Sequence, residues 1–149
     1  MENTQYLLQQ VGVIKKNTNK TWIELKDKFK PAILNLDRFS HIIVLWWIHK
    51  RDTEEGRKTL QVHPRVQNEK QPPPKSGVFA CRSPARPNPI GLTIVKLEKI
   101  DNNKIYIDRI DAIEDSPILD IKPYIPNSDC ILESKLPHYF SSLEKKRIE

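Results

Sequence analysis

Residues 92–113, LTIVKLEKIDNNKIYIDRIDAI, decide the fold class, because they contain two apolar runs separated by a polar turn. Residues 92–100 and 104–113 are rich in β-branched side chains, as strands usually are. The Asp-Asn-Asn at 101–103 has the residue types of a hairpin loop. Apolar and polar residues alternate through the second run, which is typical of a strand with one buried face. The sequence therefore predicts an antiparallel hairpin.

Other short segments rich in apolar or β-branched residues lie along the rest of the chain. They predict strands at residues 10–15, 21–25, 41–49, 59–63, 78–82 and 118–121. Helix is weakly indicated, with a turn within 30–38 and a polar terminal helix or frayed tail at 141–149. Many short strands with frequent turns predict an all-β fold, a closed or nearly closed antiparallel β-barrel with long polar loops and little helix. We find no internal repeat and expect one domain over residues 1–149.

Length and cysteine usage favour a cytoplasmic protein. The 149 residues are enough for one domain, and no apolar run approaches the roughly 18 residues of a membrane helix. The first residues lack the charged and apolar regions of a secretory signal. Cys81 and Cys130 are expected to be free thiols, and they fit no zinc pattern. We therefore predict neither a metal site nor a membrane segment.

The net charge of +6 is concentrated in one stretch of the chain. Residues 50–86 contain nine Lys or Arg and four Asp or Glu, whereas the other segments together contain sixteen and fifteen. A localised basic surplus suits a phosphate-rich partner, since each neutralised phosphate releases a counterion. The alternative is a solvated loop that keeps the protein soluble. The cations expected to receive RNA are Lys50, Arg51, Arg57, Lys58, Lys70 and Lys75.

The densest chemical signal is GVFACRSPARPNPIGL, residues 77–92. A predicted strand ends at Arg82 and enters a loop that three prolines stiffen. The polar side chains held there with little freedom are Arg82, Ser83, Arg86 and Asn88. A rigid loop with converging donors is a good site for a carboxylate, a phosphate or a purine. The alternative is a stiff connection within the barrel.

A second signal is DSPILDIKPY, residues 115–124. Asp120 is predicted to lie on the opposite face of a strand from its two apolar neighbours, and Lys122 shares its face. A carboxylate among apolar neighbours either pairs with a cation, such as Lys122 or an arginine, or takes part in chemistry. The sequence leaves both alternatives open.

Two histidines lie at the ends of the predicted strand 41–49. Period two places His41 and His49 on the same face of this strand. Histidines at strand ends are often only hydrogen-bonded rim residues. His49 leads into the basic stretch and is therefore the better site candidate.

These segments resemble the TsaA-like family of tRNA methyltransferases, also called TrmO. Residues 77–92 match its pattern GVFATRSPxRPNPIG, with Cys81 where threonine is usual. Residues 115–124 match DGTPxxDIKPY with one residue fewer. The FSH at 39–41, followed by an apolar strand and His49, resembles a third segment of the family.

The resemblance covers about residues 8–126 and leaves 127–149 as a C-terminal tail. It implies an all-β barrel, usually dimeric, that binds S-adenosyl-L-methionine. It also implies tRNA as a partner, through the anticodon arm, because the family's characterised activity methylates N6 of threonylcarbamoyladenosine next to the anticodon. The residues implied to bind the cofactor are His49, Lys50, Arg82, Ser83, Asp111, Asp115, Ser116 and Pro117. Those implied to shape the reactive end are Arg86, Asn88, Asp120, Lys122 and Tyr124.

Two departures from the family pattern keep other functions open. Only about twenty-five residues, 15–39, fill a segment that is usually longer and contributes to the cofactor pocket, and little sequence follows Tyr124. The shorter segment favours a small molecule or a protein as methyl acceptor, whereas the basic surplus in 50–86 favours RNA. A non-catalytic sensor that binds the cofactor and a partner is the third alternative.

Overall fold

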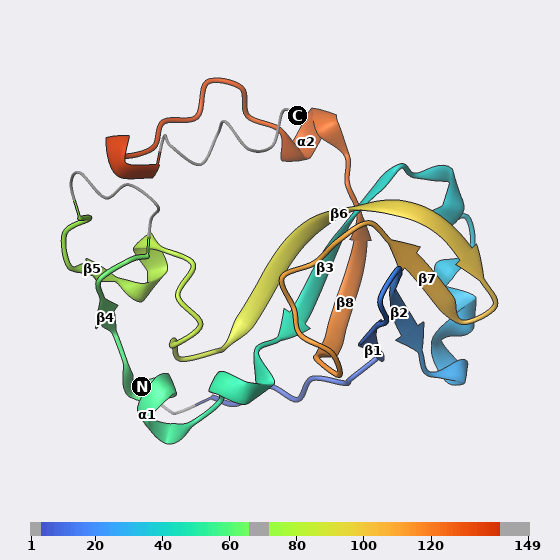
Figure 1. Ribbon diagram of the computed structural model, residues 1–149, viewed down its shortest axis with the longest axis horizontal. Coiled ribbons are helices and arrows are strands. Elements are labelled where there is room, and N and C mark those ends of the chain that lie inside the picture. The colour runs from blue at the N-terminus through green and yellow to red at the C-terminus, as the bar shows by residue number, and fades with distance from the viewer. Residues whose placement is uncertain (1–3, 66–71, 141–149) are drawn as a thin grey trace. The chain divides into compact units, whose positions relative to one another are not determined.

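The computed structural model describes residues 4–65 and 72–140, and the chain divides by its contacts into two compact units (Figure 1). The barrel unit contains Met1–Lys50 and Ile90–Ile125. The loop unit contains Arg51–Pro89 and Pro126–Glu149. The single domain expected over 1–149 stays a prediction.

Six strands of the barrel unit form a closed antiparallel barrel in the order β1-β2-β7-β6-β3-β8, and β8 pairs back to β1. They are β1 Gly12–Lys16, β2 Thr21–Leu25, β3 His41–Trp47, β6 Ile90–Asp101, β7 Lys104–Ile107 and β8 Pro117–Pro123. The long, curved β6 pairs with β3 through its first half and with β7 through its second (Figure 1). The all-β barrel predicted from the sequence is confirmed.

The barrel interior is filled by apolar side chains, because alternate residues of each strand point inward. In β3 the inward residues are Ile42, Val44 and Trp46, so the face shared by His41 and Trp47 is the outer one, in agreement with the period seen in the sequence. The core residues with 1% exposure or less are Ile14, Ile23, Ile42, Val44, Val95, Ile105, Ile107, Ile118 and Ala112. These side chains exclude water from the centre of the barrel.

Two predicted strands of the barrel are too long at their C-terminal ends. The strand predicted to reach residue 49 ends at Trp47, because β6 begins opposite that residue and offers no further partner. His49 instead begins a 3-10 turn, His49–Arg51, so its assignment to the face of His41 was wrong. The strand predicted over 104–113 ends at Ile107, since the next side chain, Asp108, takes over the pairing: its carboxylate accepts a hydrogen bond from the Lys96 N–H at 2.9 Å.

The helical turn predicted within residues 30–38 is confirmed. The structure has two 3-10 turns there, Asp27–Ile33 and Leu36–Arg38. They connect β2 to β3, and Ile33 and Leu36 pack partly buried against the barrel core. This short connection replaces the longer segment that is usual in the family pattern.

The loop unit has little regular structure. It contains a two-stranded sheet of β4 (Gln61–Val62) and β5 (Ser76–Gly77), and two short helices, α1 (Glu54–Lys58) and α2 (Pro126–Asp129). The strand predicted over 59–63 is therefore shorter than expected. The helix or tail predicted at 141–149 lies outside the described residues.

The strand predicted over 78–82 is wrong. Residues Val78–Ala80 form a 3-10 turn, and the strand of this region is β5, just before it. The guanidinium of Arg86 binds the carbonyl oxygens of Val78 and Cys81, which a strand would need for its own ladder. A side chain eight residues away thus decides the local structure.

Helix α1 was not predicted, although its residues carry helix signals. Thr53 precedes the helix, and its Oγ1 accepts a hydrogen bond from the Gly56 N–H at 3.0 Å. Glu54 and Glu55 occupy the first turn, and two basic residues occupy the last, which suits the helix dipole. Within the described residues, no helix reaches the length and apolarity that a membrane span requires. Cys81 and Cys130 are both free, as predicted.

Gly91 lies opposite Trp46 in the register of β3 and β6, and the indole occupies the space that a side chain there would need. A Cβ at Gly91 would come within 2.3–2.7 Å of three indole carbons. We expect Gly91→Ala to lower the free energy of unfolding in urea by about 1–3 kcal/mol, because the ring or the strand must move. Gly77→Ala is the control, since its added Cβ would be 3.9 Å from the nearest atom. Equal effects of the two substitutions would contradict this packing role.

Candidate functional site

The segment between β7 and β8 is held against β1 by main-chain hydrogen bonds. The Asp115 N–H donates to the Ile14 carbonyl at 2.8 Å, and the Ile14 N–H donates to the Ser116 carbonyl at 3.0 Å. Asp115 has a left-handed backbone with φ of 63°, a conformation that aspartate tolerates better than most residues. A tight turn before β8 therefore places Asp115, Ser116 and Pro117 beside β1.

Two consecutive lysines at the end of β1 bind the segment between β7 and β8. Lys15 Nζ forms an ion pair with Asp115 Oδ1 at 2.6 Å, and Lys16 Nζ donates to the Ile110 carbonyl at 3.0 Å. The hydrogen bond to Asp115 raises the pKa of Lys15 above its ordinary value. Sequence reasoning did not single out these lysines, because their partners lie about a hundred residues away along the chain.

Asp111, a predicted cofactor residue, is anchored to the barrel wall. Thr93 Oγ1 donates to the Asp111 carboxylate at 2.5 Å and accepts from the Trp46 indole N–H at 3.1 Å. The chain of hydrogen bonds runs from the indole, through β6, to a carboxylate on an exposed turn. It fixes the orientation of Asp111, which a loop carboxylate would otherwise lack.

Two other predicted cofactor residues carry buried polar atoms without a protein partner. Ser116 is fully buried and its Oγ makes no hydrogen bond within the described residues, and the same is true of the buried Nδ1 of His49. Among the described residues these are the two side-chain atoms of this kind. A buried polar atom without a partner is uncommon and marks a place where a ligand or ordered water supplies the missing bond.

The end of β8 carries the residues predicted to shape the reactive end. Asp120 Oδ2 and Lys122 Nζ form an ion pair at 2.7 Å, which raises the pKa of Lys122. Both side chains are about half exposed, so the pair contributes little to folding. The Tyr124 ring lies edge-on to the His41 ring, with centroids 6.5 Å apart. The backbone N–H of Tyr124 donates to the His41 carbonyl. Of the two alternatives open for Asp120, the structure shows the pairing with Lys122.

In the loop unit, Arg86 binds three backbone carbonyls of its own loop. Its Nε donates to Ser83 at 2.8 Å, and its Nη2 donates to Val78 at 2.5 Å and to Cys81 at 2.7 Å. Arg86 therefore has a structural role, and its expected part at the reactive end stays a prediction. Arg82 contrasts with it, because that side chain is exposed and forms no hydrogen bond or ion pair within the described residues.

The predicted site residues thus form four groups, three in the barrel unit and one in the loop unit. Those brought together in the barrel unit beside β1 and β6 are Asp111, Asp115, Ser116 and Pro117. Those that follow β3 are His49 and Lys50, and those along the end of β8 are Asp120, Lys122 and Tyr124. The loop unit contains Arg82, Ser83, Arg86 and Asn88. Within the described part of the chain, no group of three or more His, Cys, Asp or Glu is placed to hold a metal ion.

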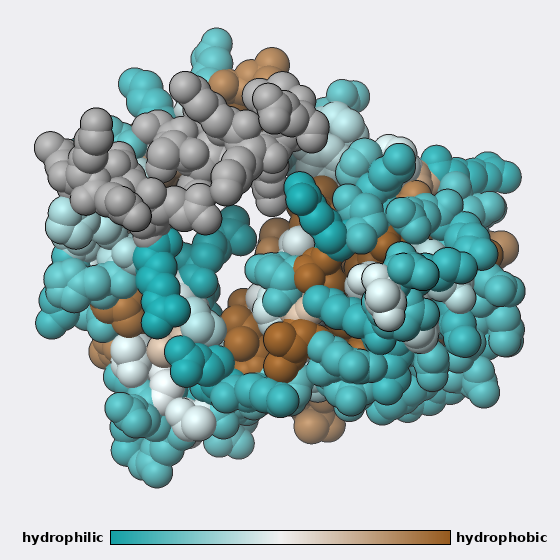
Figure 2. All heavy atoms as spheres, viewed as in Figure 1, coloured by the Kyte–Doolittle hydropathy of each residue, from teal (hydrophilic) through white to brown (hydrophobic). Residues whose placement is uncertain are grey.

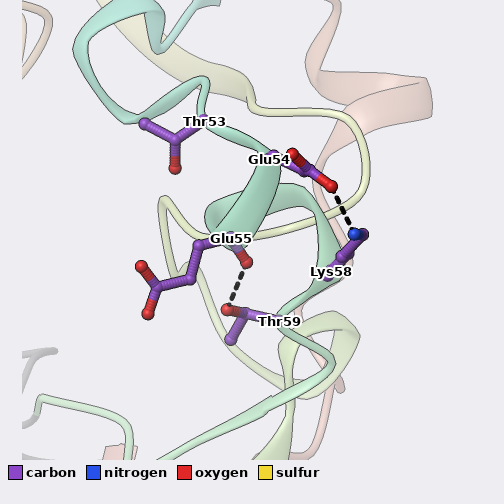
Figure 3. Close-up of a pocket in the computed structure, with 5 residues that line it drawn as sticks. All are labelled: Thr53, Glu54, Glu55, Lys58 and Thr59. Atoms are coloured by element: carbon purple, nitrogen blue, oxygen red, sulfur yellow. Dashed lines mark hydrogen bonds and ion pairs between the residues drawn. The ribbon is translucent and has the colours of Figure 1, made fainter.

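A hollow of about 700 Å³ in the loop unit lies around α1, and its lining residues include none of the predicted site residues. Figure 3 shows its five lining residues, with Lys58 joined to Glu54 and the Thr59 hydroxyl joined to the Glu55 carbonyl. The two glutamates and the shallow, open form do not suit an anionic ligand. We do not assign this hollow to the site.

A second hollow, of about 280 Å³, lies in the barrel unit. It is lined mostly by apolar residues of the β2–β3 connection, including Phe29, Ile33 and Phe39. Asp120 is the predicted site residue on its wall. The short connection between β2 and β3 therefore borders the reactive end implied by the sequence.

Comparison with known proteins identifies the family. Residues 9–130 match the model of the tRNA-methyltransferase O N-terminal domain. The chain belongs to this family. The TrmO resemblance inferred from the two motifs is thereby confirmed.

Relatives of this TrmO-family chain have two kinds of name. It is 48% identical over 127 residues to a probable S-adenosyl-L-methionine-binding protein of Methanocaldococcus jannaschii, covering 84% of this chain and 97% of that one. It is 43% identical over 98 residues to the tRNA (adenine(37)-N6)-methyltransferase of Homo sapiens, covering 66% of this chain and 21% of the human protein. The crystal structure of TrmO from Pseudomonas aeruginosa has the same fold, with a TM-score of 0.69 and 24% identity. The match covers 92% of this chain and 62% of the bacterial one.

The loop around Arg86 gives a test that needs no ligand. Arg86→Lys removes the planar fork that reaches three carbonyls, and a hydrogen bond to a charged group contributes about 1.5–3 kcal/mol. We expect the amides of residues 78–86 to exchange with deuterium at least about ten times faster, since the loop opens more easily. Arg82→Lys, at an exposed position in the same loop, should leave these rates unchanged. Similar exchange in both variants would contradict the role of Arg86.

Proposed function

We propose that this chain is an S-adenosyl-L-methionine-dependent methyltransferase that acts on tRNA. One observation carries the proposal furthest. The two buried side-chain atoms without a partner in the described residues belong to Ser116 and His49, and the family resemblance implies cofactor contacts at both. Names of several relatives agree with this, because they state S-adenosyl-L-methionine binding or tRNA methylation.

The residues present fit such a cofactor chemically. The Ser116 hydroxyl and the His49 ring nitrogen can each complete a hydrogen bond to a polar ligand atom. The fixed carboxylate of Asp111 can accept from a hydroxyl or ammonium group, and the exposed guanidinium of Arg82 can bind a carboxylate. When bound, the cofactor supplies a methyl group already activated by a sulfonium. The protein then has chiefly to align donor and acceptor.

Methylation of an adenine N6 releases one proton, and a nearby carboxylate helps to accept it. We assign this role to Asp120. The Asp120 carboxylate lies 2.7 Å from Lys122 Nζ, and about half of the Asp120 side chain is open to solvent, so a ligand can reach it. No covalent intermediate is needed, so the reaction does not require Cys81 as a nucleophile.

The basic surplus supports an RNA acceptor, but fewer of its cations are available than the sequence suggests. Arg57 pairs with Asp52, and Lys58 pairs with Glu54 within α1. Apart from Arg82, which we assign to the cofactor, the exposed cations of residues 51–65 and 72–89 that form no ion pair within the described residues are Arg51, Arg65 and Lys75. Lys70 lies outside the described residues. We propose that Arg51, Arg65 and Lys75 contact the RNA phosphates.

We further propose that the methyl acceptor is N6 of threonylcarbamoyladenosine next to the anticodon. The protein then binds the anticodon arm of the tRNA. We also propose that the chain acts in the cytoplasm, where tRNA is abundant and the free thiols Cys81 and Cys130 stay reduced. Mass spectrometry of tRNA nucleosides from cells with and without the gene tests this directly. In cells without the gene, that nucleoside alone should lack one methyl group and be about 14 mass units lighter. An unchanged tRNA profile would favour a small-molecule or protein acceptor instead.

Arg82 gives the sharpest test of cofactor binding. Losing a charge-assisted hydrogen bond costs about 1.5–3 kcal/mol, so Arg82→Ala should raise the dissociation constant for S-adenosylhomocysteine about 10- to 150-fold in titration calorimetry. Lys75→Ala removes an exposed cation of the same unit and should leave the constant unchanged. Equal binding by Arg82→Ala and the parent would show that this arginine does not contact the cofactor.

We propose a homodimer that uses the outer face of β3 and β6. Three apolar cross-strand pairs lie there: Ile43 with Ile94, Leu45 with Leu92, and Trp47 with Ile90. The β6 members are 36–44% exposed. Figure 2 shows apolar residues gathered over this part of the barrel. A contiguous apolar patch on a soluble protein is typical of an interface.

Light scattering at micromolar concentration tests the dimer. Ile94→Glu places a charge in the middle of the apolar patch and should give a monomer, because an unpaired buried charge is costly. Lys96→Glu, two residues along on the same outer face of β6, should remain a dimer. A parent protein that scatters as a monomer, or an Ile94→Glu variant that still pairs, would refute this interface.

A further inference from the structure

A row of four side chains crosses the outer face of the barrel on β1, β2, β7 and β6. The strand registers place Lys15 opposite Trp22, Trp22 opposite Tyr106, and Tyr106 opposite Lys99. Since paired residues lie on the same face of a sheet, the two aromatic rings are neighbours with a lysine at each end of the row. Of these strands, β6 also takes part in the apolar patch of β3 and β6, through Ile90, Leu92 and Ile94, and Lys99 lies farther along it.

The two aromatic rings form a small platform. Their centroids are 6.0 Å apart, the planes are inclined by 37°, and both side chains are half-buried. The Trp22 indole N–H donates to Glu24 at 3.3 Å, which helps to fix the ring. Neither side chain is part of the barrel core, so packing of the interior does not explain two large aromatics here.

Three lysines surround this platform. Lys99 Nζ lies 4.7 Å and Lys20 Nζ 5.7 Å from the Tyr106 ring centroid, and Lys104 Nζ lies 5.7 Å from the Trp22 centroid. None of the three forms an ion pair within residues 4–65 and 72–140. Lys15 differs, because Asp115 already neutralises it. The three ammonium groups are on long flexible stems and can move from the rings to a nearby anion.

A partner with both flat apolar faces and regularly spaced negative charges fits this arrangement. Unpaired nucleobases stack on aromatic side chains, and their phosphates attract the surrounding lysines, which is how sheet surfaces recognise single-stranded RNA. A duplex would offer its phosphates but not its base faces. An acidic protein would engage the lysines but would gain little from the rings.

We propose that the Trp22–Tyr106 platform, with Lys20, Lys99 and Lys104, binds a single-stranded segment of the RNA substrate. The inference rests on the proposed function, since it takes RNA as the partner. It adds a contact surface on the barrel, outside the basic stretch 50–86. Bases stack on the two rings, and the three lysines contact the phosphates on either side.

Fluorescence anisotropy with a labelled 12-nucleotide single-stranded RNA, repeated over a salt series, tests the surface. The variant Lys20→Gln/Lys99→Gln/Lys104→Gln should bind at least about tenfold more weakly, and its salt dependence should flatten by roughly 0.7 units per lost phosphate contact. The control Lys26→Gln/Lys28→Gln/Lys96→Gln removes the same charge from exposed lysines of the same unit. It should bind like the parent.

The ring is tested separately. Tyr106→Leu should weaken RNA binding about 5- to 100-fold, whereas Tyr106→Phe keeps the stacking surface and should bind like the parent. Binding of S-adenosylhomocysteine serves as the measure of correct folding in every variant and should not change. If the parent does not bind RNA, the proposed function fails together with the platform. If the parent binds but both Tyr106 variants and both lysine variants match it, the platform is refuted and the proposed function stands.

Discussion

The short pairing of β1 with β8 is the constraint on which the rest of the structure depends, because it closes the barrel. The register contains two residue pairs, Gly12 with Ile118 and Val13 with Pro117. Gly12 is required there, since a Cβ would lie 2.5 Å from the Glu24 carbonyl oxygen on β2. The same β1–β8 pairing fixes the position of Ser116 and Asp115 beside β1, because they lie one and two residues before Pro117. The pairing that closes the barrel therefore also positions the site residues Ser116 and Asp115.

Local sequence was enough to predict the barrel and most of its strands. The residues of β2 were predicted to the residue, those of β6 to within two residues at each end, and four of the seven residues of β8, because alternation and β-branching are read from neighbours in sequence. The errors fall where a side chain from another part of the sequence determines the local backbone pairing. Arg86 takes carbonyls that a strand at 78–82 would use, and the Asp108 side chain replaces the ladder after Ile107.

The site was predictable in its residue types but not in its connections. Motifs pointed to Asp115, Ser116 and Arg82, whereas the contacts that fix the carboxylates of Asp115 and Asp111 join positions far apart in the chain. Lys15 reaches Asp115, and Thr93 reaches Asp111, only after the barrel has closed. The aromatic platform was missed for the same reason, because Trp22 and Tyr106 become neighbours through strand register alone.

The Asp108 carboxylate has a consequence for how the family varies. Since it binds the Lys96 N–H in place of a backbone carbonyl, the pairing of β7 with β6 ends there, and the segment after Asp108 is no longer held in the sheet register. An insertion or deletion between Asp108 and the β1–β8 seam then changes a turn and leaves strand pairing as it is. The barrel can keep one architecture while this turn is resized, and the chain's motif at 115–117, one residue shorter than the family pattern, is such a case.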